Sequence, residues 1–180
     1  MEIKELELKG VYLITPKVFE DERGHFFESF NQNVFQENEL DLNFVQDNQS
    51  LSQKGVLRGL HFQKPPFAQG KLVRVIKGKV LDVAVDIRKK SPTYGKSIAL
   101  EISEYNKLMF YIPEGFAHGF LTLEDNTIFS SKCTNFFNKE SEGSLLWNDV
   151  DLNIDWGNIT PLLSEKDKEA PVFSTFKSPF

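Results

Sequence analysis

KLVRVIKGKVLDVAVDIR, residues 71–88, holds the clearest secondary-structure pattern in the chain. Two runs of strand-forming residues flank a central Lys-Gly pair, and the second run alternates aliphatic residues with polar or small ones. Alternation with a period of two is typical of strands, and a short break that contains glycine is typical of the turn between two paired strands. The stretch therefore predicts a β-hairpin, with Asp82, Asp86 and Arg88 in a polar row that faces solvent.

Further strand-like runs follow at short intervals, separated by Pro, Gly, Asn or Asp. Short strands at this spacing are typical of an all-β sandwich or barrel, and helix is expected to be minor. The runs are SIALEI (97–102), LMFYI (108–112), FAHGFLTL (116–123) and TIFSSKCTNFF (127–137), with short helical candidates at NVFQENEL (33–40) and SEKDKEA (164–170).

Length and composition fit one domain, and we expect residues 1–180 to form a single unit. No apolar run approaches the roughly 20 residues that span a bilayer, and the N-terminus lacks the apolar stretch of a secretory signal, so a cytoplasmic location is expected. The 21 basic and 26 acidic side chains give a net charge of −5, which disfavours broad nucleic-acid binding. Cys133 is the only cysteine, which excludes an internal disulfide and a multi-cysteine metal site.

Three histidines, His25, His61 and His118, are the first candidates for chemistry. A histidine-rich metal site on a β-barrel usually needs two close histidines and a carboxylate. His61 and His118 lie far apart in the sequence and no His-x-His pair occurs, so the spacing gives no sign of a metal site.

The segment VLRGLHFQ, residues 56–63, leaves two arrangements open for Arg58 and His61. Simple strand alternation places them on opposite faces, with Arg58 in solvent and His61 buried and bonded to backbone, and the local sequence favours this arrangement. The alternative is a bulge at Gly59, whose extra residue would turn both side chains to the same side.

Local patterns leave the roles of a few other polar residues equally open. Alternation places Lys71 on the same strand face as two valines that follow it. Its ammonium therefore points either into the interior, where it needs an anionic or carbonyl partner, or into water at the end of the strand. Ser131 is a small polar residue between apolar neighbours on one strand face. The pattern around Asp167 and Lys166 favours a helix cap for the first and solvation for the second.

Several segments, taken in chain order, resemble the dTDP-4-dehydrorhamnose 3,5-epimerase family. Long ordered matches that span most of a chain are much more specific than one short motif. The segments are FEDERGHFFESF (19–30), FVQDNQS (44–50), VLRGLHFQ (56–63), AQGKLVRV (68–75), DVAVDIRKKSPTYGK (82–96), IPEGFAHGF (112–120), NKESEGSLLWND (138–149) and LSEKD (163–167).

The resemblance implies a cupin-type jelly-roll barrel, usually a homodimer, that acts without metal or organic cofactor. The implied reaction inverts C3 and C5 of dTDP-4-keto-6-deoxy-glucose through enolate intermediates, in dTDP-L-rhamnose biosynthesis. By match to the family's motifs, His61 is the base and Asp167 orients its ring and stabilises the imidazolium. Lys71 matches the residue that stabilises charge on the keto oxygen.

One position departs from the family. Inversion needs a proton returned to the enolate face opposite the base, and the family uses the tyrosine of a Tyr-Lys-Cys-Thr segment for this step. The matching residue here is Ser131, which is shorter and a much weaker acid than a phenol. Because loss of a positioned acid costs on the order of 10²–10⁴ in rate, a 3-monoepimerase or a related keto-sugar isomerase is an alternative function.

The resemblance also marks substrate contacts. Basic residues are expected because a diphosphate needs paired donors, and an aromatic ring is expected against the thymine. Phe137 takes the place of a family tyrosine, which keeps stacking and loses the hydroxyl. The implied substrate-binding residues are Arg23, Phe26, Glu28, Gln46, Asp47, Asn48, Arg58, His118, Phe137, Glu142 and Lys166.

Two functions of other classes stay open. A non-catalytic sugar-nucleotide binding module would bind the nucleotide without exchanging hydrogen at either carbon. A metal-dependent cupin enzyme would lose its activity to a chelator.

Overall fold

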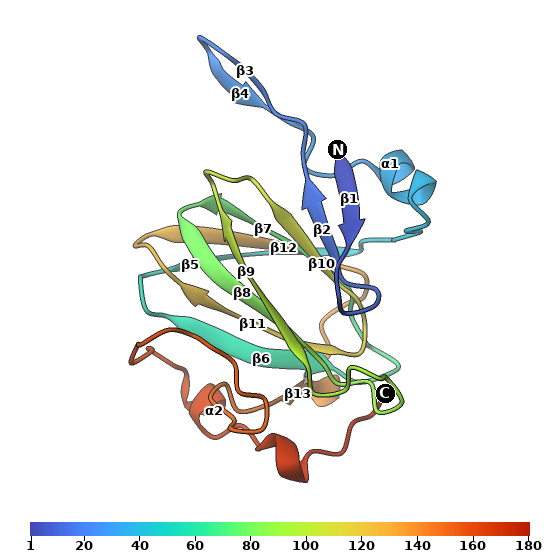
Figure 1. Cartoon of the computed structure of the whole chain (residues 1–180), viewed down its shortest axis with the longest axis vertical. Helices are drawn as coiled ribbons and strands as arrows, with labels where there is room; N and C mark the ends of the chain where they lie inside the picture. Colours follow the sequence, from blue (N-terminus) through green and yellow to red (C-terminus); the bar gives the residue numbers. More distant parts are fainter.

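The computed structural model describes residues 1–180 and consists mostly of antiparallel strands (Figure 1). One sheet has six strands in the spatial order β1 (Glu2–Glu5), β2 (Tyr12–Thr15), β10 (Met109–Ile112), β7 (Lys71–Lys77), β12 (Thr127–Cys133) and β5 (Gln46–Ser52). The other has five, in the order β13 (Glu142–Ser144), β6 (Leu57–Gln63), β11 (Phe116–Thr122), β8 (Lys79–Asp86) and β9 (Ser97–Ser103).

The remaining elements are short and lie outside the two sheets. They are the hairpin β3 (Phe19–Asp21) and β4 (Gly24–Phe26), the helices α1 (Gln32–Glu37) and α2 (Glu165–Lys168), and the 3-10 turns Lys139–Ser141 and Phe173–Thr175. Both helical candidates are therefore confirmed, each shorter than its sequence segment. None of the helices is long and apolar enough to cross a membrane.

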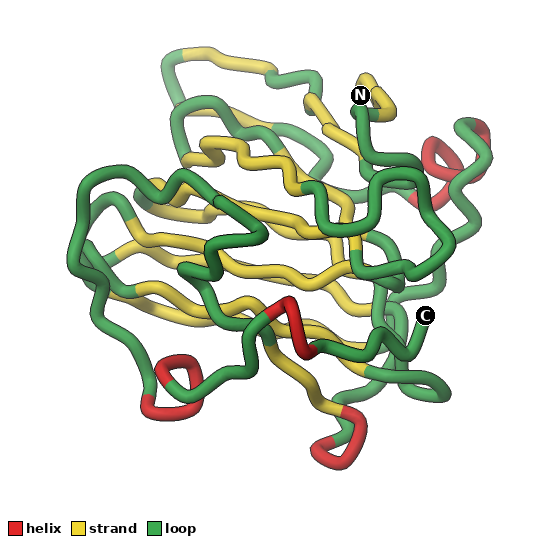
Figure 2. The backbone as a smooth tube through the Cα atoms, turned by 60° about the horizontal axis from the view of Figure 1, so that its bottom comes forward, coloured by secondary structure: helices red, strands yellow, loops and turns green.

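The two large sheets face each other as the layers of an open jelly roll, which confirms the all-β fold (Figure 2). Apolar side chains from both sheets, among them Val73, Phe110 and Phe120, form a buried cluster between the layers. A second cluster packs the outer face of the five-stranded sheet against the C-terminal segment around Trp156. A third covers the outer face of the six-stranded sheet with Phe35 of α1.

The predicted hairpin over residues 71–88 is wrong. Its two strands, β7 and β8, belong to different sheets, and the chain crosses from one sheet to the other at Gly78. Gly78 has a φ of +81° and lies so close to Thr127 that a Cβ would collide with it, so this position requires glycine. Alternation identified both strands correctly, but it carries no information about which strands they pair with.

The predicted polar row facing solvent is also wrong, because the five-stranded sheet is covered on both faces. Val83 and Val85 pack against the C-terminal layer, while Asp82 on the opposite face of β8 is fully buried against His118 in the space between the sheets. Asp86 is fully buried as well, and only Arg88 retains partial exposure. A strand whose alternating sequence predicts one exposed face can thus be buried on both faces.

Candidate active site

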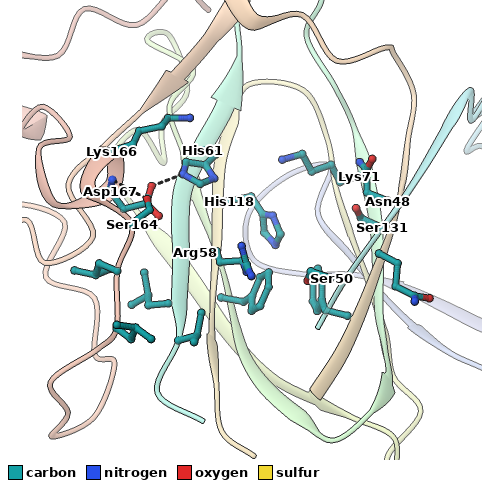
Figure 3. Close-up of a pocket in the computed structure, with 17 residues that line it drawn as sticks. Asn48, Ser50, Arg58, His61, Lys71, His118, Ser131, Ser164, Lys166 and Asp167 are labelled. Atoms are coloured by element: carbon teal, nitrogen blue, oxygen red, sulfur yellow. Dashed lines mark hydrogen bonds and ion pairs between the residues drawn. The ribbon is translucent and has the colours of Figure 1, made fainter. Parts of the chain in front are cut away.

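A cavity of about 650 Å³ lies between the sheets and is lined mostly by polar side chains (Figure 3). Strands of both sheets and the C-terminal segment around α2 contribute to it. Its polar residues are Asn48, Gln49, Ser50, Arg58, His61, Lys71, His118, Ser131, Ser164, Lys166 and Asp167.

His61 and Asp167 form a hydrogen-bonded pair in this cavity. His61 Nε2 lies 2.6 Å from Asp167 Oδ1, and the side chain of His61 keeps 29% of its surface exposed while Asp167 keeps 4%. Burial alone would raise the pKa of Asp167, but the hydrogen bond and charge of His61, with the bonds from Ser164 and the Gly59 amide, hold it below its ordinary value. The carboxylate is therefore ionised at neutral pH and acts as an acceptor for the imidazole N–H.

Helix α2 brings Asp167 to His61. Ser164 is the N-cap, and its side chain accepts from the Asp167 amide at 3.2 Å, as the sequence pattern predicted. The same residue that completes the capped turn presents its carboxylate to β6, so the capping interpretation of Asp167 is correct but incomplete.

A bulge in β6 turns Arg58 and His61 to the same side. His118 pairs with His61 and Phe120 pairs with Arg58, so β6 carries one more residue than β11 between these pairs. Both side chains line the cavity, so the placement on opposite faces is wrong, and His61 bonds to Asp167 rather than to backbone. Arg58 remains exposed, as that arrangement predicted. The bulge needs glycine at position 59, where φ is +138° and a Cβ would lie 2.5 Å from the backbone of Gly119.

Lys71 enters from the opposite wall. It begins β7 in the six-stranded sheet, and its side chain extends into the cavity on the far side from His61 (Figure 3). Of the two positions that alternation allowed, the interior one is confirmed. Burial lowers the pKa of Lys71, an effect opposed by the nearby Cys133 and by the carboxylates of Asp82 and Glu142.

Ser131 and Asn48 lie beside Lys71 on the same wall. In the β12 pairings, Ser131 stands opposite Asn48 of β5 and Val73 of β7, and Cys133 stands opposite Lys71. The amide of Asn48 donates to Cys133 Sγ at 3.5 Å, and burial raises the pKa of this thiol. Position 131 therefore faces the cavity, where a small hydroxyl replaces the larger side chain that the family motif implies.

A second histidine–carboxylate pair was missed in the sequence. His118 Nε2 lies 2.8 Å from Asp82 Oδ1, both side chains are buried, and the imidazole stacks on Phe129. Asp82 Oδ2 has no partner. The alternation of β8 could have indicated this pair. Asp82 lies on the same strand face as Ala84, whose small side chain faces the space between the sheets.

An adjoining cavity of about 300 Å³ collects three more of the expected substrate contacts, namely Gln46, Phe137 and Glu142. It shares His61, Lys71, Asn48 and Ser131 with the first cavity. Gln46 accepts from the Phe137 amide at 2.9 Å, and Glu142 forms an ion pair with Lys166.

The other expected contacts lie elsewhere in the chain. Arg23 and Phe26 are on the exposed β3–β4 hairpin, which projects away from the sheets (Figure 1). Glu28 follows the hairpin and accepts from Asn31, and Asp47 points outward to pair with Lys132 at 2.9 Å. The single chain does not bring these four residues to the His61 cavity.

Comparisons with known proteins identify the family of this chain. A family profile described as dTDP-4-dehydrorhamnose 3,5-epimerase matches residues 5–175. The chain belongs to this family. The dTDP-4-dehydrorhamnose 3,5-epimerase of Shigella flexneri is 54% identical over 168 residues, which cover 93% of each chain.

Two solved structures of epimerases align over almost the whole chain. The dTDP-6-deoxy-D-glucose-3,5-epimerase RmlC of Legionella pneumophila Philadelphia 1, in complex with dTDP-4-keto-L-rhamnose, has a TM-score of 0.93 and 45% identity, covering 98% of this chain and 94% of that one. ChmJ, a 3'-monoepimerase from Streptomyces bikiniensis in complex with dTDP-quinovose, has a TM-score of 0.90 and 31% identity, covering 94% and 87%. Family membership, first indicated by the ordered segments, is confirmed.

Proposed function

We propose that this chain inverts C3 and C5 of dTDP-4-keto-6-deoxy-glucose, the dTDP-4-dehydrorhamnose 3,5-epimerase reaction of dTDP-L-rhamnose biosynthesis. The observation that carries the proposal is the His61–Asp167 pair, which opens onto a polar cavity with the ammonium of Lys71 across from it. This arrangement offers a base for a hydrogen next to a ketone and a cation for the enolate oxygen.

The base works through one defined nitrogen. Because the ionised Asp167 only accepts hydrogen bonds, His61 Nε2 carries the hydrogen and Nδ1 carries the lone pair. Nδ1 takes the proton from the carbon beside the carbonyl, and Asp167 stabilises the resulting imidazolium. Lys71 favours the enolate because its positive charge lies on the side where the oxyanion develops.

The nucleotide end of the substrate needs cationic contacts. Arg58 lines the cavity and is held by a bond from its Nε to Ser52 Oγ at 3.2 Å, which leaves its terminal nitrogens free for a diphosphate. Lys166 lies on the same side, and Phe137 offers an exposed ring for the thymine. A nucleotide-sugar substrate accords with the expected cytoplasmic location.

We also propose a homodimer in which the β3–β4 hairpin of one copy completes the cavity of another. Arg23 and Phe26 are exposed on that hairpin, and 68% of the Phe26 surface is accessible in the single chain. Mixing inactive Arg23→Gln and His61→Ala subunits should restore activity, because a mixed dimer contains one intact site. A monomeric native protein, or mixtures without recovery, would contradict the dimer.

Inversion at C3 alone is the second candidate function. Ser131 favours it, because the family's acid tyrosine is absent from this position. The structural relative ChmJ, a 3'-monoepimerase, shows only that the fold can carry out this reaction.

Proton NMR of the reaction in deuterium oxide tests these functions together. Deuterium at C3 and C5 with an L-configured product supports the double epimerase, and inversion at C3 alone supports the monoepimerase. Nucleotide binding without exchange at either carbon would instead indicate a binding module, and loss of turnover with a chelator would indicate a metal-dependent enzyme.

A further inference from the structure

The cavity has two chemically different walls. His61 and His118 stand opposite each other on the paired strands β6 and β11 of the five-stranded sheet. Lys71, Ser131 and Asn48 stand on strands of the six-stranded sheet and face them across the cavity (Figure 3). A planar enolate held between the walls therefore has the base on one face and the Lys71 wall on the other.

Inversion requires a proton from that second wall. The family's tyrosine would supply it, but position 131 offers only a serine hydroxyl, which is a very weak acid. The other side chains that the six-stranded sheet contributes to the main cavity are amides, a second hydroxyl, an aromatic ring and one ammonium: Asn48, Gln49, Ser50, Phe129 and Lys71.

Two observations distinguish Lys71 on this wall. Its ammonium forms neither a hydrogen bond nor an ion pair within the chain, so its hydrogens are free to reach a substrate, whereas Lys166 is paired with Glu142. It also lies close to Ser131 on the same sheet face, because Lys71 pairs with Cys133, which is two residues from Ser131 along β12. The thiol of Cys133 is on the same strand face, is buried and accepts a hydrogen bond from Asn48.

We propose that Lys71 is the acid that returns a proton to the enolate face opposite His61, in place of the absent tyrosine. This role rests on the proposed epimerase function and adds to the electrostatic role of the same ammonium. Burial supports it, since it lowers the pKa of Lys71 and so makes the ammonium a stronger acid near neutral pH.

The step balances within the protein and solvent. The C–H bond breaks as its proton moves to His61 Nδ1, and the electron pair forms the enolate. An Nζ–H bond of Lys71 then breaks, the proton forms a new C–H bond on the other face, and the carbonyl is restored. The positive charge on Lys71 is present while the oxyanion exists and is lost when the ketone returns. The imidazolium and the neutral amine exchange protons with water, to which His61 is partly exposed.

The substitution Lys71→Arg separates the two roles, because arginine keeps the charge but does not release a proton. In deuterium oxide, His61 should still remove hydrogen and return deuterium to the same face. We expect inversion to fall on the order of 10²–10⁴-fold, while hydrogen exchange with retained configuration falls by less than about tenfold. Lys77→Arg, an exposed lysine at the other end of β7, is the matched control and should leave both rates unchanged.

A second variant tests the same role by rescue. In the Ser131→Tyr background a phenol is available on the same wall, so Lys71→Arg should cost inversion far less than it does in the native background. Recovery of at least about tenfold in the double variant supports the proposal. An active Ser131→Tyr protein in which Lys71→Arg costs as much as before would overturn it.

The outcomes separate this role from the proposed function. A native protein that exchanges no hydrogen at C3 or C5 refutes the epimerase function and the role of Lys71 with it. A native protein that inverts, but whose Lys71→Arg variant loses exchange and inversion by the same factor or loses neither, refutes the role of Lys71 alone. If tyrosine does not fit at position 131, the comparison of the native protein with Lys71→Arg still tests the role of Lys71.

Discussion

The imidazole of His61 and the carboxylate of Asp167 meet at 2.6 Å although 106 residues separate them in the chain. Strand β6 holds the first and the capped turn of α2 holds the second, so the pair forms only when the C-terminal segment packs on the five-stranded sheet. In the proposed mechanism, catalysis therefore depends on the docking of the last part of the chain.

Asp167→Asn should leave a folded protein with little activity. The amide fits the site but no longer supplies the negative charge that stabilises the imidazolium, so we expect kcat to fall on the order of 10²–10⁴-fold. Exchange and inversion should fall together, unlike in Lys71→Arg, because Asp167 acts before the enolate forms. Asp151→Asn changes an exposed carboxylate in the C-terminal segment and serves as the control. Near-native exchange in Asp167→Asn would show that His61 needs no partner.

Gly59→Ala should destabilise the protein and displace β6, the strand that carries His61. A left-handed backbone costs a residue with a Cβ about 1–2 kcal/mol, and collision with Gly119 adds about 1–3 kcal/mol. Gly157 also has a positive φ, +78°, but no atom lies within 4 Å of the position of its Cβ, so Gly157→Ala should show backbone strain without a collision. Urea denaturation of both variants measures the difference, and equal losses in the free energy of unfolding would contradict the close packing of β6 on β11.

Arg58→Gln should weaken nucleotide binding much more than it slows the chemical step. A hydrogen bond to a charged group contributes about 1.5–3 kcal/mol, so the Kd for dTDP should rise about 10–100-fold. Titration calorimetry with dTDP measures this directly. Lys54→Gln, which removes an exposed cation just before β6, should leave the Kd close to native. An unchanged Kd in Arg58→Gln would place the diphosphate elsewhere.

Asp86 should make folding stability fall in acid. Burial alone would raise its pKa, but bonds from Arg88, Ser91 and Thr93 lower it from 3.8 to about 2. Because the folded pKa is depressed, the stabilisation is present above pH 4 and is lost as the pH falls from about 4 through 2; it amounts to roughly 2 kcal/mol.

Thermal unfolding measured from pH 7 to pH 2 tests this contribution. Asp86→Asn should be less stable than the native protein at pH 7, and the difference should shrink towards pH 2. The exposed Asp151→Asn should keep the native pH dependence. Parallel curves for the native protein and Asp86→Asn would contradict the assignment.

The strands could be predicted from alternation, but their partners could not. A Lys-Gly break suits a tight hairpin and a crossover between sheets equally well, and only the contact of Gly78 with Thr127, in a distant strand, shows which one forms. The burial of Asp82 and Asp86 was missed for a related reason. Their side chains lie on the face of β8 that points between the two sheets, while Val83 and Val85 on the other face pack against the C-terminal layer. Local periodicity does not report that both faces are covered.

The site could be predicted where the family motifs and the local sequence indicate the same arrangement. Ser164 signalled the capped turn that carries Asp167, and Gly59 signalled the bulge that aligns Arg58 with His61. Local sequence nevertheless favoured the wrong orientation of Arg58, because the energy that decides it comes from pairing with β11. The hairpin that carries Arg23 lies outside the cavity, and no local pattern states where such an exposed segment docks.

Two aromatic rings that line the cavity form a contact between the two sheets. Phe120 of β11 and Phe129 of β12 stack with ring centroids 4.1 Å apart, one ring from each sheet. The stacked pair therefore joins the sheet that carries His61 to the sheet that carries Lys71. A change to either ring should shift the two sheets relative to each other, and with them the distance between the proposed base and the proposed acid.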